Sequence, residues 1–367
     1  MNTSLEVEYW VVDGDGDLVS SDPLLDVADW IVPEFVEPVI EIKTSPCSSM
    51  AELRAEFLDR IETVVDAARD RGRRLVPLAT PLSAPPAEIP YREKESTDLQ
   101  RRIVGPTFDD ARVCVGTHVH FERQNPADQL NALTAIDPAF ALVNSSSYYR
   151  GERLIECARP YLYRRSCYER CPRQGQLWPY VDSVDEWERK LDDAYESFKS
   201  RALRRGVAAA EFEAAFDPYD AVWTPVRLRT AVPTVEWRSP DATLPSEILR
   251  LTDAVRAFVV DADQRGTTVV ASDGTDDRQT NGRQLPAFET VESITDAAIR
   301  DGLSNARVRT YLRSLGFDPS AFEPLANQHT DARLTTRRAK RLRLDAARQL
   351  EADLTRARHR VPARSDD

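Results

Sequence analysis

Residues 113–122 read Val-Cys-Val-Gly-Thr-His-Val-His-Phe-Glu, an alternation of apolar and polar side chains. Successive side chains of a β-strand point to opposite faces, so this period of two predicts a strand. One face would carry Val113, Val115, Thr117, Val119 and Phe121, and the other would carry His118, His120 and Glu122. Two of the four histidines in the chain are therefore expected side by side on a polar strand face.

Three other segments divide their side chains in the same way. In residues 5–11, Glu6 and Glu8 share one face, with Cα atoms about 7 Å apart. Residues 40–42 place Glu41 opposite two isoleucines, and residues 234–238 place Glu236 and Arg238 opposite Val235 and Trp237. Strands with one apolar and one polar face are typical of an antiparallel sheet that helices cover on one side. We therefore predict an α+β fold whose sheet gathers carboxylates, imidazoles and a guanidinium on its polar face.

Sequence features typical of helix N-termini precede three long segments that are expected to be helical. Ser49 and Glu52 have the spacing of a capping box, and Gly72 supplies a stop. Residues 183–206 repeat this pattern, while a third helix is expected over 245–266 because proline is tolerated in a first helical turn.

The C-terminal part has a different composition. Residues 274–288 are rich in Asp, Gly, Thr, Gln and Arg and are expected to form a loop. Residues 333–360 are basic, and Leu342, Leu350 and Leu354 partly mark an apolar stripe. Because stacking aromatic residues are absent there, a packed surface helix is favoured over a helix that binds RNA or DNA.

The composition narrows the class of protein. The chain has 367 residues, of which 41% are hydrophobic, and a net charge of −12. It has no apolar run of about 18 residues and no signal-peptide pattern at its start, so we expect a cytoplasmic protein without a membrane segment. The acidic balance argues against general nucleic-acid binding, and together with the scarcity of lysine it suggests a salt-loving source.

The cysteines do not suggest a disulfide framework. They are odd in number and scattered, and none forms a Cys-x-x-Cys pair: Cys47, Cys114, Cys157, Cys167 and Cys171. Reduced, buried thiols are favoured over a metal site at Cys167 and Cys171.

The polar sheet face suits divalent cations. Carboxylates with one or two histidines attract hard cations, and Mg²⁺ shares its coordination shell with ATP phosphates. Each piece alone is more often a solvated strand face, so the inference depends on their concurrence. The sequence has neither the phosphate-binding loop Gly-x-x-x-x-Gly-Lys-Ser/Thr nor a Gly-x-Gly-x-x-Gly after a strand. Phosphates would then have to be held by metal ions and arginines.

Six segments, in the same order, resemble the motifs of the type 2 glutamate-cysteine ligases, also called carboxylate-amine ligases. They are Ser-Leu-Glu-Val-Glu-Tyr at 4–9, Val-Ile-Glu-Ile-Lys-Thr-Ser-Pro-Cys at 39–47, Gly-Thr-His-Val-His-Phe at 116–121, Ala-Leu-Val-Asn-Ser-Ser at 141–146, Tyr-Arg followed by Pro and Gly within 163–175, and Trp-x-x-x-Arg with Thr-Val-Glu-Trp-Arg-x-x-Asp within 223–241. Ser4, Val7 and Ser146 depart from the usual Gly, Glu and Pro of those motifs.

The resemblance implies a glutamine synthetase-like fold, with a curved, mainly antiparallel sheet and helices on one side. It implies a ligase catalytic domain over residues 1–290 and a helical extension over 291–367, packed on it or following it. The activity implied is the ATP- and Mg²⁺-dependent joining of the glutamate γ-carboxylate to the amine of cysteine through an acyl phosphate, with small-molecule partners only. Assembly with identical chains stays open.

The resemblance also assigns roles to residues of this sequence. The expected metal ligands are Glu6, Glu8, Glu41, His118 and Glu236. The expected catalytic residues are Arg238, Glu8 and His120, and the expected substrate-binding residues are Arg164, Arg227 and Asn144. Which histidine would bind metal and which phosphate stays open. The alternatives are another amine, phosphoryl transfer to a guanidino group, or a non-catalytic protein that binds Mg-ATP.

Overall fold

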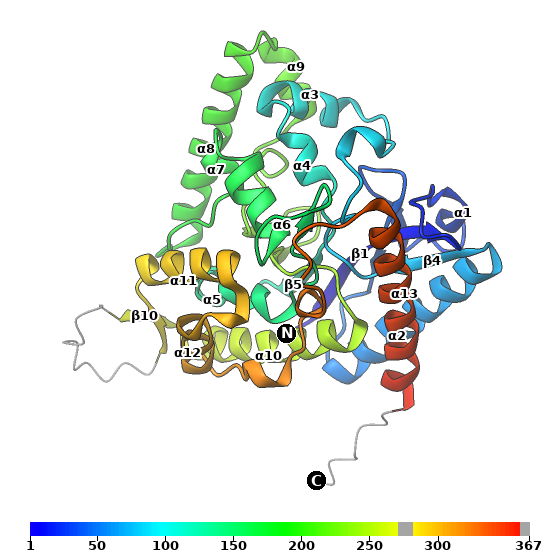
Figure 1. The fold of residues 1–367 in the computed structure, drawn as a ribbon. Coiled ribbons are helices and arrows are strands. Elements are labelled where there is room, and N and C mark those ends of the chain that lie inside the picture. The colour runs from blue at the N-terminus through cyan, green and yellow to red at the C-terminus, as the bar shows by residue number, and fades with distance from the viewer. Residues whose placement is uncertain (271–281, 360–367) are drawn as a thin grey trace.

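A seven-stranded antiparallel sheet forms the centre of the computed structural model, which describes residues 1–270 and 282–359 (Figure 1). The strand order is β2-β3-β1-β5-β9-β8, and β4 pairs with the C-terminal end of β1. The strands are β1 (Thr3–Asp13), β2 (Ile31–Pro33), β3 (Val39–Lys43), β4 (Arg73–Val76), β5 (Thr117–Glu122), β8 (Val226–Leu228) and β9 (Thr234–Trp237). The predicted α+β fold with an antiparallel sheet is confirmed.

The register of the strands brings the polar residues together. Glu6 of β1 lies opposite Lys43 of β3 and opposite His118 of β5. In the same way Glu8 faces Glu41. On the other side of β5, His120 faces Glu236 of β9, which in turn faces Arg227 of β8. Directly opposed residues of neighbouring strands share a face, so the four predicted polar strand faces form one surface.

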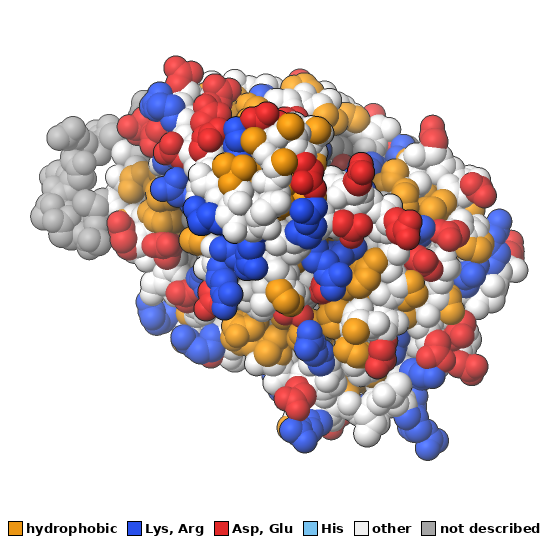
Figure 2. Space-filling model, turned by 90° about the horizontal axis from the view of Figure 1, so that it is seen from above, with side chains coloured by type: hydrophobic (Ala, Val, Ile, Leu, Met, Phe, Trp, Pro, Cys, Tyr) orange, Lys and Arg blue, Asp and Glu red, His pale blue; other side chains and the backbone are white. Residues whose placement is uncertain are grey.

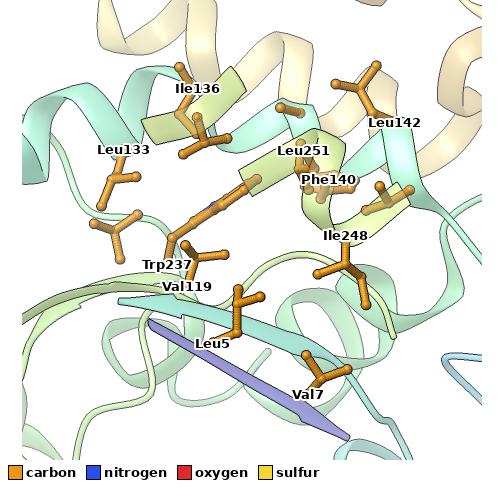
Figure 3. Packing of buried hydrophobic residues seen from close by; sticks show 14 of the residues in the cluster. Leu5, Val7, Val119, Leu133, Ile136, Phe140, Leu142, Trp237, Ile248 and Leu251 are labelled. Carbon is orange, nitrogen blue, oxygen red and sulfur yellow. The ribbon is translucent and has the colours of Figure 1, made fainter. Parts of the chain in front are cut away.

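The opposite face of the sheet is the core. Leu5, Val7, Val119 and Trp237 point toward helical residues that include Leu133, Phe140 and Ile248 (Figure 3). The helices of this layer are α2 (Met50–Asp70), α5 (Pro126–Ala135) and α10 (Pro245–Arg265). All of these sheet residues are fully buried, which fixes the register because a slip of one residue would move them to the polar face.

The three predicted long helices are present. The side chain of Ser49 accepts a hydrogen bond from the backbone N–H of Glu52 at the start of α2, and Gly72 follows it with φ +65°. Ser183 caps α8 (Val184–Arg204) in the same way. Pro245 lies in the first turn of α10, and Gly266 with φ +71° follows its end. Only glycine adopts such positive φ values without strain, which explains the stop signals.

The predicted strand over residues 113–122 is too long. β5 begins at Thr117, because the backbone of Val115 bonds outside the sheet, although the Gly116 carbonyl still accepts a hydrogen bond from Glu8 of β1. Val115 N–H donates to the carbonyl of Ala79, and Gly116 bridges to Asp241. Val113 and Val115 consequently pack in a second hydrophobic cluster rather than beside Val119 and Phe121.

The predicted loop over 274–288 is partly wrong. Residues 274–281 lie outside the described residues, but β11 (Arg283–Pro286) pairs in parallel with β10 (Thr267–Val270). Leu285 is buried in the main core, and α11 (Phe288–Asp301) begins directly after β11. Tertiary burial of one leucine therefore overrides a polar local composition.

The basic C-terminal helix packs by its apolar stripe. It is α13 (Thr336–His359), and Leu342, Leu350 and Leu354 are buried as predicted. Leu350 and Leu354 belong to the same hydrophobic cluster as the sheet, so the helix packs on the main body. The boundary at residue 290 between a domain and an extension stays a prediction.

The remaining elements surround the sheet. They are α1 (Asp22–Leu25), α3 (Glu95–Val104), α4 (Phe108–Arg112), β6 (Tyr148–Tyr149), β7 (Glu152–Arg153), α6 (Ala158–Tyr161), a π-helix over Leu162–Cys167, α7 (Pro172–Gly175), α9 (Ala209–Ala215), α12 (Ala306–Ser314) and short 3₁₀ turns. Helices α3, α4 and α9 gather at the top of Figure 1, away from the layer formed by α5 and α10, and α8 runs from there down to α5. The five cysteines are buried and free of disulfides. Among the described residues, no helix combines the length and apolar character needed to cross a bilayer.

Candidate functional site

A cavity of about 490 Å³ opens over the polar face of the sheet. Its walls include the predicted site residues Glu6, Glu8, Glu41, His118 and Arg238. His120, Glu236 and Arg227 lie beside it on the same sheet face, since His120 and Arg227 are the direct neighbours of Glu236 across β9. The sheet therefore brings together eight of the ten residues predicted for the site.

Three overlapping groups of carboxylate and imidazole side chains have ligand atoms within 4.8 Å of one another. They are Glu6 with His120 and Glu236, Glu6 with Glu41 and His118, and Glu8 with Glu34 and Glu41. The His118 ring lies at the centre, with Nδ1 3.3 Å from Glu6 Oε2 and 3.6 Å from Glu236 Oε1. These are oxygen and nitrogen donors of the kind that divalent cations select.

His120 gives independent support for a ligand at this face. Its Nδ1 lies 3.0 Å from the hydroxyl of Thr234, and such a contact fixes the orientation of the ring. The other nitrogen, Nε2, is buried and has no hydrogen-bond partner among the described residues. It lies 3.4 Å from Glu6 Oε2 and 4.0 Å from Glu236 Oε1. A buried imidazole nitrogen without a partner costs free energy, so the donor set fits a cation between these three residues.

Arginines surround the fully buried Glu236. Arg227 Nε donates to Glu236 Oε2 at 2.6 Å, and Arg238 donates to Oε1 at 2.7 Å. Burial opposes ionisation of Glu236, but the charges of Arg227 and Arg238 outweigh it and hold the pKa of Glu236 well below its usual range. Burial, with the nearby charge of Arg238, lowers the pKa of Arg227 to about 10.

The carboxylates of Glu8, Glu34 and Glu41, at the other end of the cluster, have raised pKa values, unlike Glu236. Burial raises the pKa of Glu8, although its Oε2 accepts a hydrogen bond of 2.6 Å from the backbone of Gly116. Burial and the charge of Glu6 raise the pKa of Glu41 to about 8. The pKa of Glu34 is raised well above normal by burial and by the charges of Glu8 and Glu41. Such crowding of like charges stores repulsion that a bound cation would relieve.

Two further groups complete the electrostatics. Burial and the charge of Arg238 lower the pKa of His118 to about 3, so its ring is neutral at physiological pH and free to act as a ligand. Burial also opposes ionisation of Glu6, but the hydrogen bond with His118 and the close approach of His120 outweigh it and lower the pKa of Glu6.

Several residues of the cavity were not predicted from the sequence. Glu34 follows the three-residue strand β2, in which Val32 faces Glu41. Glu34 lies two positions beyond Val32, so the alternation of the strand places it on the polar side of the sheet. The pairing of β2 with β3 would have been needed to predict this position from the sequence. The cavity is also lined by Lys43, Tyr163 and Arg229. Lys43 and Tyr163 lie in segments that resemble motifs of the ligase family, but the resemblance gave them no role.

The structure gives Arg164 and Asn144 other contacts. The Arg164 guanidinium forms a buried bidentate pair with Asp137, at 2.6 and 3.2 Å, and donates to Ser239. The amide nitrogen of Asn144 donates to the carbonyl of Glu156 at 2.8 Å. Neither residue is among those that line the 490 Å³ cavity, so their substrate-binding roles stay predictions.

Known proteins resemble this chain in sequence and in fold. The sequence model of glutamate-cysteine ligase family 2 (GCS2) matches residues 5–358. The chain belongs to this family. A protein of Salinispora arenicola named "Putative glutamate--cysteine ligase 2" is 29% identical over 308 residues, which cover 76% of this chain and 74% of the relative. A protein of the same name from Jannaschia sp. is 27% identical over 255 residues, covering 65% of this chain and 60% of the relative.

Two solved structures share the fold of this family member. The bifunctional glutathione synthetase of Pasteurella multocida aligns with 96% of this chain and 52% of its own, at a TM-score of 0.59 and 16% identity. The glutamate–cysteine ligase of Francisella tularensis, solved in complex with AMP, aligns with 98% of this chain and 91% of its own, at a TM-score of 0.51 and 13% identity. These likenesses confirm the fold that the resemblance implied.

Proposed function

We propose that this protein is an ATP- and Mg²⁺-dependent carboxylate–amine ligase that joins the γ-carboxylate of glutamate to the amine of cysteine. One observation carries the proposal: five carboxylates and two imidazoles meet at one cavity, beside Arg227, Arg229 and Arg238. This is a site for several cations and for a substrate with several anionic oxygens. Membership of glutamate-cysteine ligase family 2 supports the choice of reaction.

The metal ligands would be the residues of the three overlapping groups. Glu6, Glu41, His118, His120 and Glu236 offer oxygen and nitrogen donors, and Glu8 and Glu34 complete the set. Bound Mg²⁺ would neutralise charge on the phosphates of ATP during phosphoryl transfer. The chain's own part is to hold these donors on adjacent strands, where their positions are fixed before any substrate arrives.

The arginines have the complementary role. Arg238 is anchored at one nitrogen by Glu236 and lines the cavity, so it is oriented to bind anionic oxygens there. A planar guanidinium can bind two oxygens of a carboxylate or phosphoryl group at once. Arg227 is bound to Glu236 and to the carbonyl of Val222, which leaves Arg238 and Arg229 as the residues best suited to contact substrate.

In the proposed reaction an oxygen of the γ-carboxylate attacks the terminal phosphorus of ATP, and ADP leaves. The resulting acyl phosphate is attacked at carbon by the amine, and phosphate leaves as the amide forms. The amine loses one proton in this step. Glu8 and His120 stay the proposed catalytic residues beside Arg238.

The test is phosphate release by the purified protein with ATP, Mg²⁺ and glutamate, with and without cysteine, followed by the mass of the product. We expect release that requires both amino acids, and the mass of γ-glutamylcysteine. A different conjugate from a panel of amines would keep the ligase reaction and change the acceptor. Phosphate release with no dependence on glutamate, or binding of Mg-ATP without turnover, would contradict the proposal.

A further inference from the structure

Lys43 occupies a place in the carboxylate cluster where a cation would be expected. Its Nζ lies 2.9 Å from Glu6 Oε1 and 2.9 Å from Glu41 Oε1. The side chain of Lys43 is 39% exposed and those of Glu6 and Glu41 are 23% and 6% exposed, so the ammonium enters the cluster from the cavity side. The register enforces this position, since Lys43 lies directly opposite Glu6.

The choice of residue is informative because this chain uses lysine at only five positions: Lys43, Lys94, Lys190, Lys199 and Lys340. The other strong cations that contact the carboxylate cluster are the arginines Arg227, Arg229 and Arg238. An ammonium is a compact point charge with donors in three directions, whereas a guanidinium is planar and extended. Only the ammonium resembles a spherical metal ion in shape.

The partners of Lys43 define one particular ligand group. Of the three overlapping groups, the middle one consists of Glu6, Glu41 and His118. Lys43 already binds an oxygen of both carboxylates in that group. Lys43 binds Oε1 of each carboxylate, whereas Oε2 of Glu6 and of Glu41 lies toward His118, at 3.3 and 3.9 Å from its Nδ1.

We propose that the Lys43 ammonium is a built-in cation that replaces a divalent ion at the middle group, so that the site holds two divalent ions instead of three. The two ions would be held by the outer groups, Glu6 with His120 and Glu236, and Glu8 with Glu34 and Glu41. This inference rests on the proposed function, which supplies the divalent ions.

Electrostatics supports this division. A third divalent ion at the middle group would share two carboxylates with a positive ammonium in contact with both, and like charges at such distances repel. Each outer group contains only one carboxylate that Lys43 contacts, Glu6 in one and Glu41 in the other, and each also offers a carboxylate that Lys43 does not bind, Glu236 or Glu8. Lys43 thereby also acts as a positioning residue, because it fixes Glu6 and Glu41 across strands β1 and β3.

The experiment counts bound Mn²⁺, which replaces Mg²⁺ and is visible by electron paramagnetic resonance as the free ion. Wild-type protein, Lys43→Met and Lys94→Met are titrated with Mn²⁺ alone, without nucleotide, and their folding is compared by circular dichroism. Lys94 lines the same cavity but belongs to none of the three ligand groups, so its removal controls for the loss of one positive charge.

We expect two Mn²⁺ per chain for the wild type and for Lys94→Met, and three for Lys43→Met. Three ions in the wild type, or two in folded Lys43→Met, would overturn the inference about Lys43 and leave the proposed function standing. No Mn²⁺ binding by any of the three proteins would overturn the proposed metal site as well. The wild-type count remains decisive if Lys43→Met does not fold.

Discussion

Glu236 has a fully buried side chain that two arginines bind, and it also belongs to a group of candidate metal ligands. We expect Glu236→Gln to lower turnover by about 100-fold, because the group that stabilises developing charge is lost. The same change should also destabilise the fold by about 3 kcal/mol, because Arg227 and Arg238 lose their charged partner in a buried site. Steady-state rates over a range of Mg²⁺ and urea unfolding measure the two effects.

The control for this change is Glu292→Gln, an exposed residue of α11. It should leave both quantities unchanged. If Glu236→Gln turned over normally at every Mg²⁺ concentration, the residue would not belong to the reacting site. If it lost stability alone, Glu236 would serve only the arginine cluster.

The change Arg238→Lys tests whether the site needs the planar shape of the Arg238 guanidinium as well as its charge. Its guanidinium donates to Glu236 and lines the cavity, so a second edge remains for substrate oxygens. Arg238→Lys keeps the charge but loses the planar fork, and we expect turnover at saturating substrate to fall about 100-fold with the fold intact. Arg341→Lys, an exposed change on α13, is the matched control. Wild-type turnover for Arg238→Lys would remove Arg238 from the reaction.

At the scale of elements, α13 supplies a missing cap to α10. Leu244 at the start of α10 provides no side-chain cap, but Asp353 of α13 accepts hydrogen bonds from the backbone and hydroxyl of Ser246, at 2.8 and 2.7 Å. Asp353 is buried, and its negative charge lies at a helix N-terminus. We expect Asp353→Ala to lower the free energy of unfolding by about 1–3 kcal/mol, measured by urea unfolding.

Asp345→Ala is the control for the Asp353 change, because Asp345 lies on the same helix and pairs only with the exposed Arg348 among the described residues. It should cost no more than about 0.5 kcal/mol. Equal stability of the two variants would show that the contact between α13 and α10 does not depend on this cap.

Elements with a local period were predictable from the sequence. The alternation around Glu6, Glu41, His118 and Glu236 placed these residues on one face, because apolar and polar residues alternate in each segment. Glu34 was missed because β2 reads Ile-Val-Pro, which shows no alternation of apolar and polar residues.

Long-range partners were not predictable. Arg164 was recognised within a motif, but its partner Asp137 stands 27 positions earlier, as a single acid in an apolar run. Nothing local indicates that the two will meet in the core. The same reason explains residues 113–116, where Val115 bonds to the distant residues Ala79 and Ala242, while Gly116 still accepts a hydrogen bond from Glu8 of β1.

At the scale of the whole molecule, the net charge of −12 predicts a response to salt. The face in Figure 2 carries interspersed acidic and basic side chains, so the acidic residues of this face are not gathered in one patch. Screening should reduce repulsion from the acidic excess, and we expect both the melting temperature and turnover to rise from 0.1 to about 2 M KCl. Sucrose at equal water activity is the control. Highest stability in dilute buffer would contradict the proposal of a salt-adapted protein.

We propose that the polar face of the sheet promotes transfer of the terminal phosphoryl group of ATP to a carboxylate. The most direct test follows an oxygen atom. Glutamate labelled with ¹⁸O in both γ-carboxylate oxygens is incubated with ATP, Mg²⁺, cysteine and the protein, and the released phosphate is analysed by mass. If an acyl phosphate forms, the carboxylate oxygen that attacked phosphorus leaves with it. We expect one ¹⁸O in each phosphate and one in the amide product. Phosphate without ¹⁸O, released by attack of water on ATP, would contradict the account.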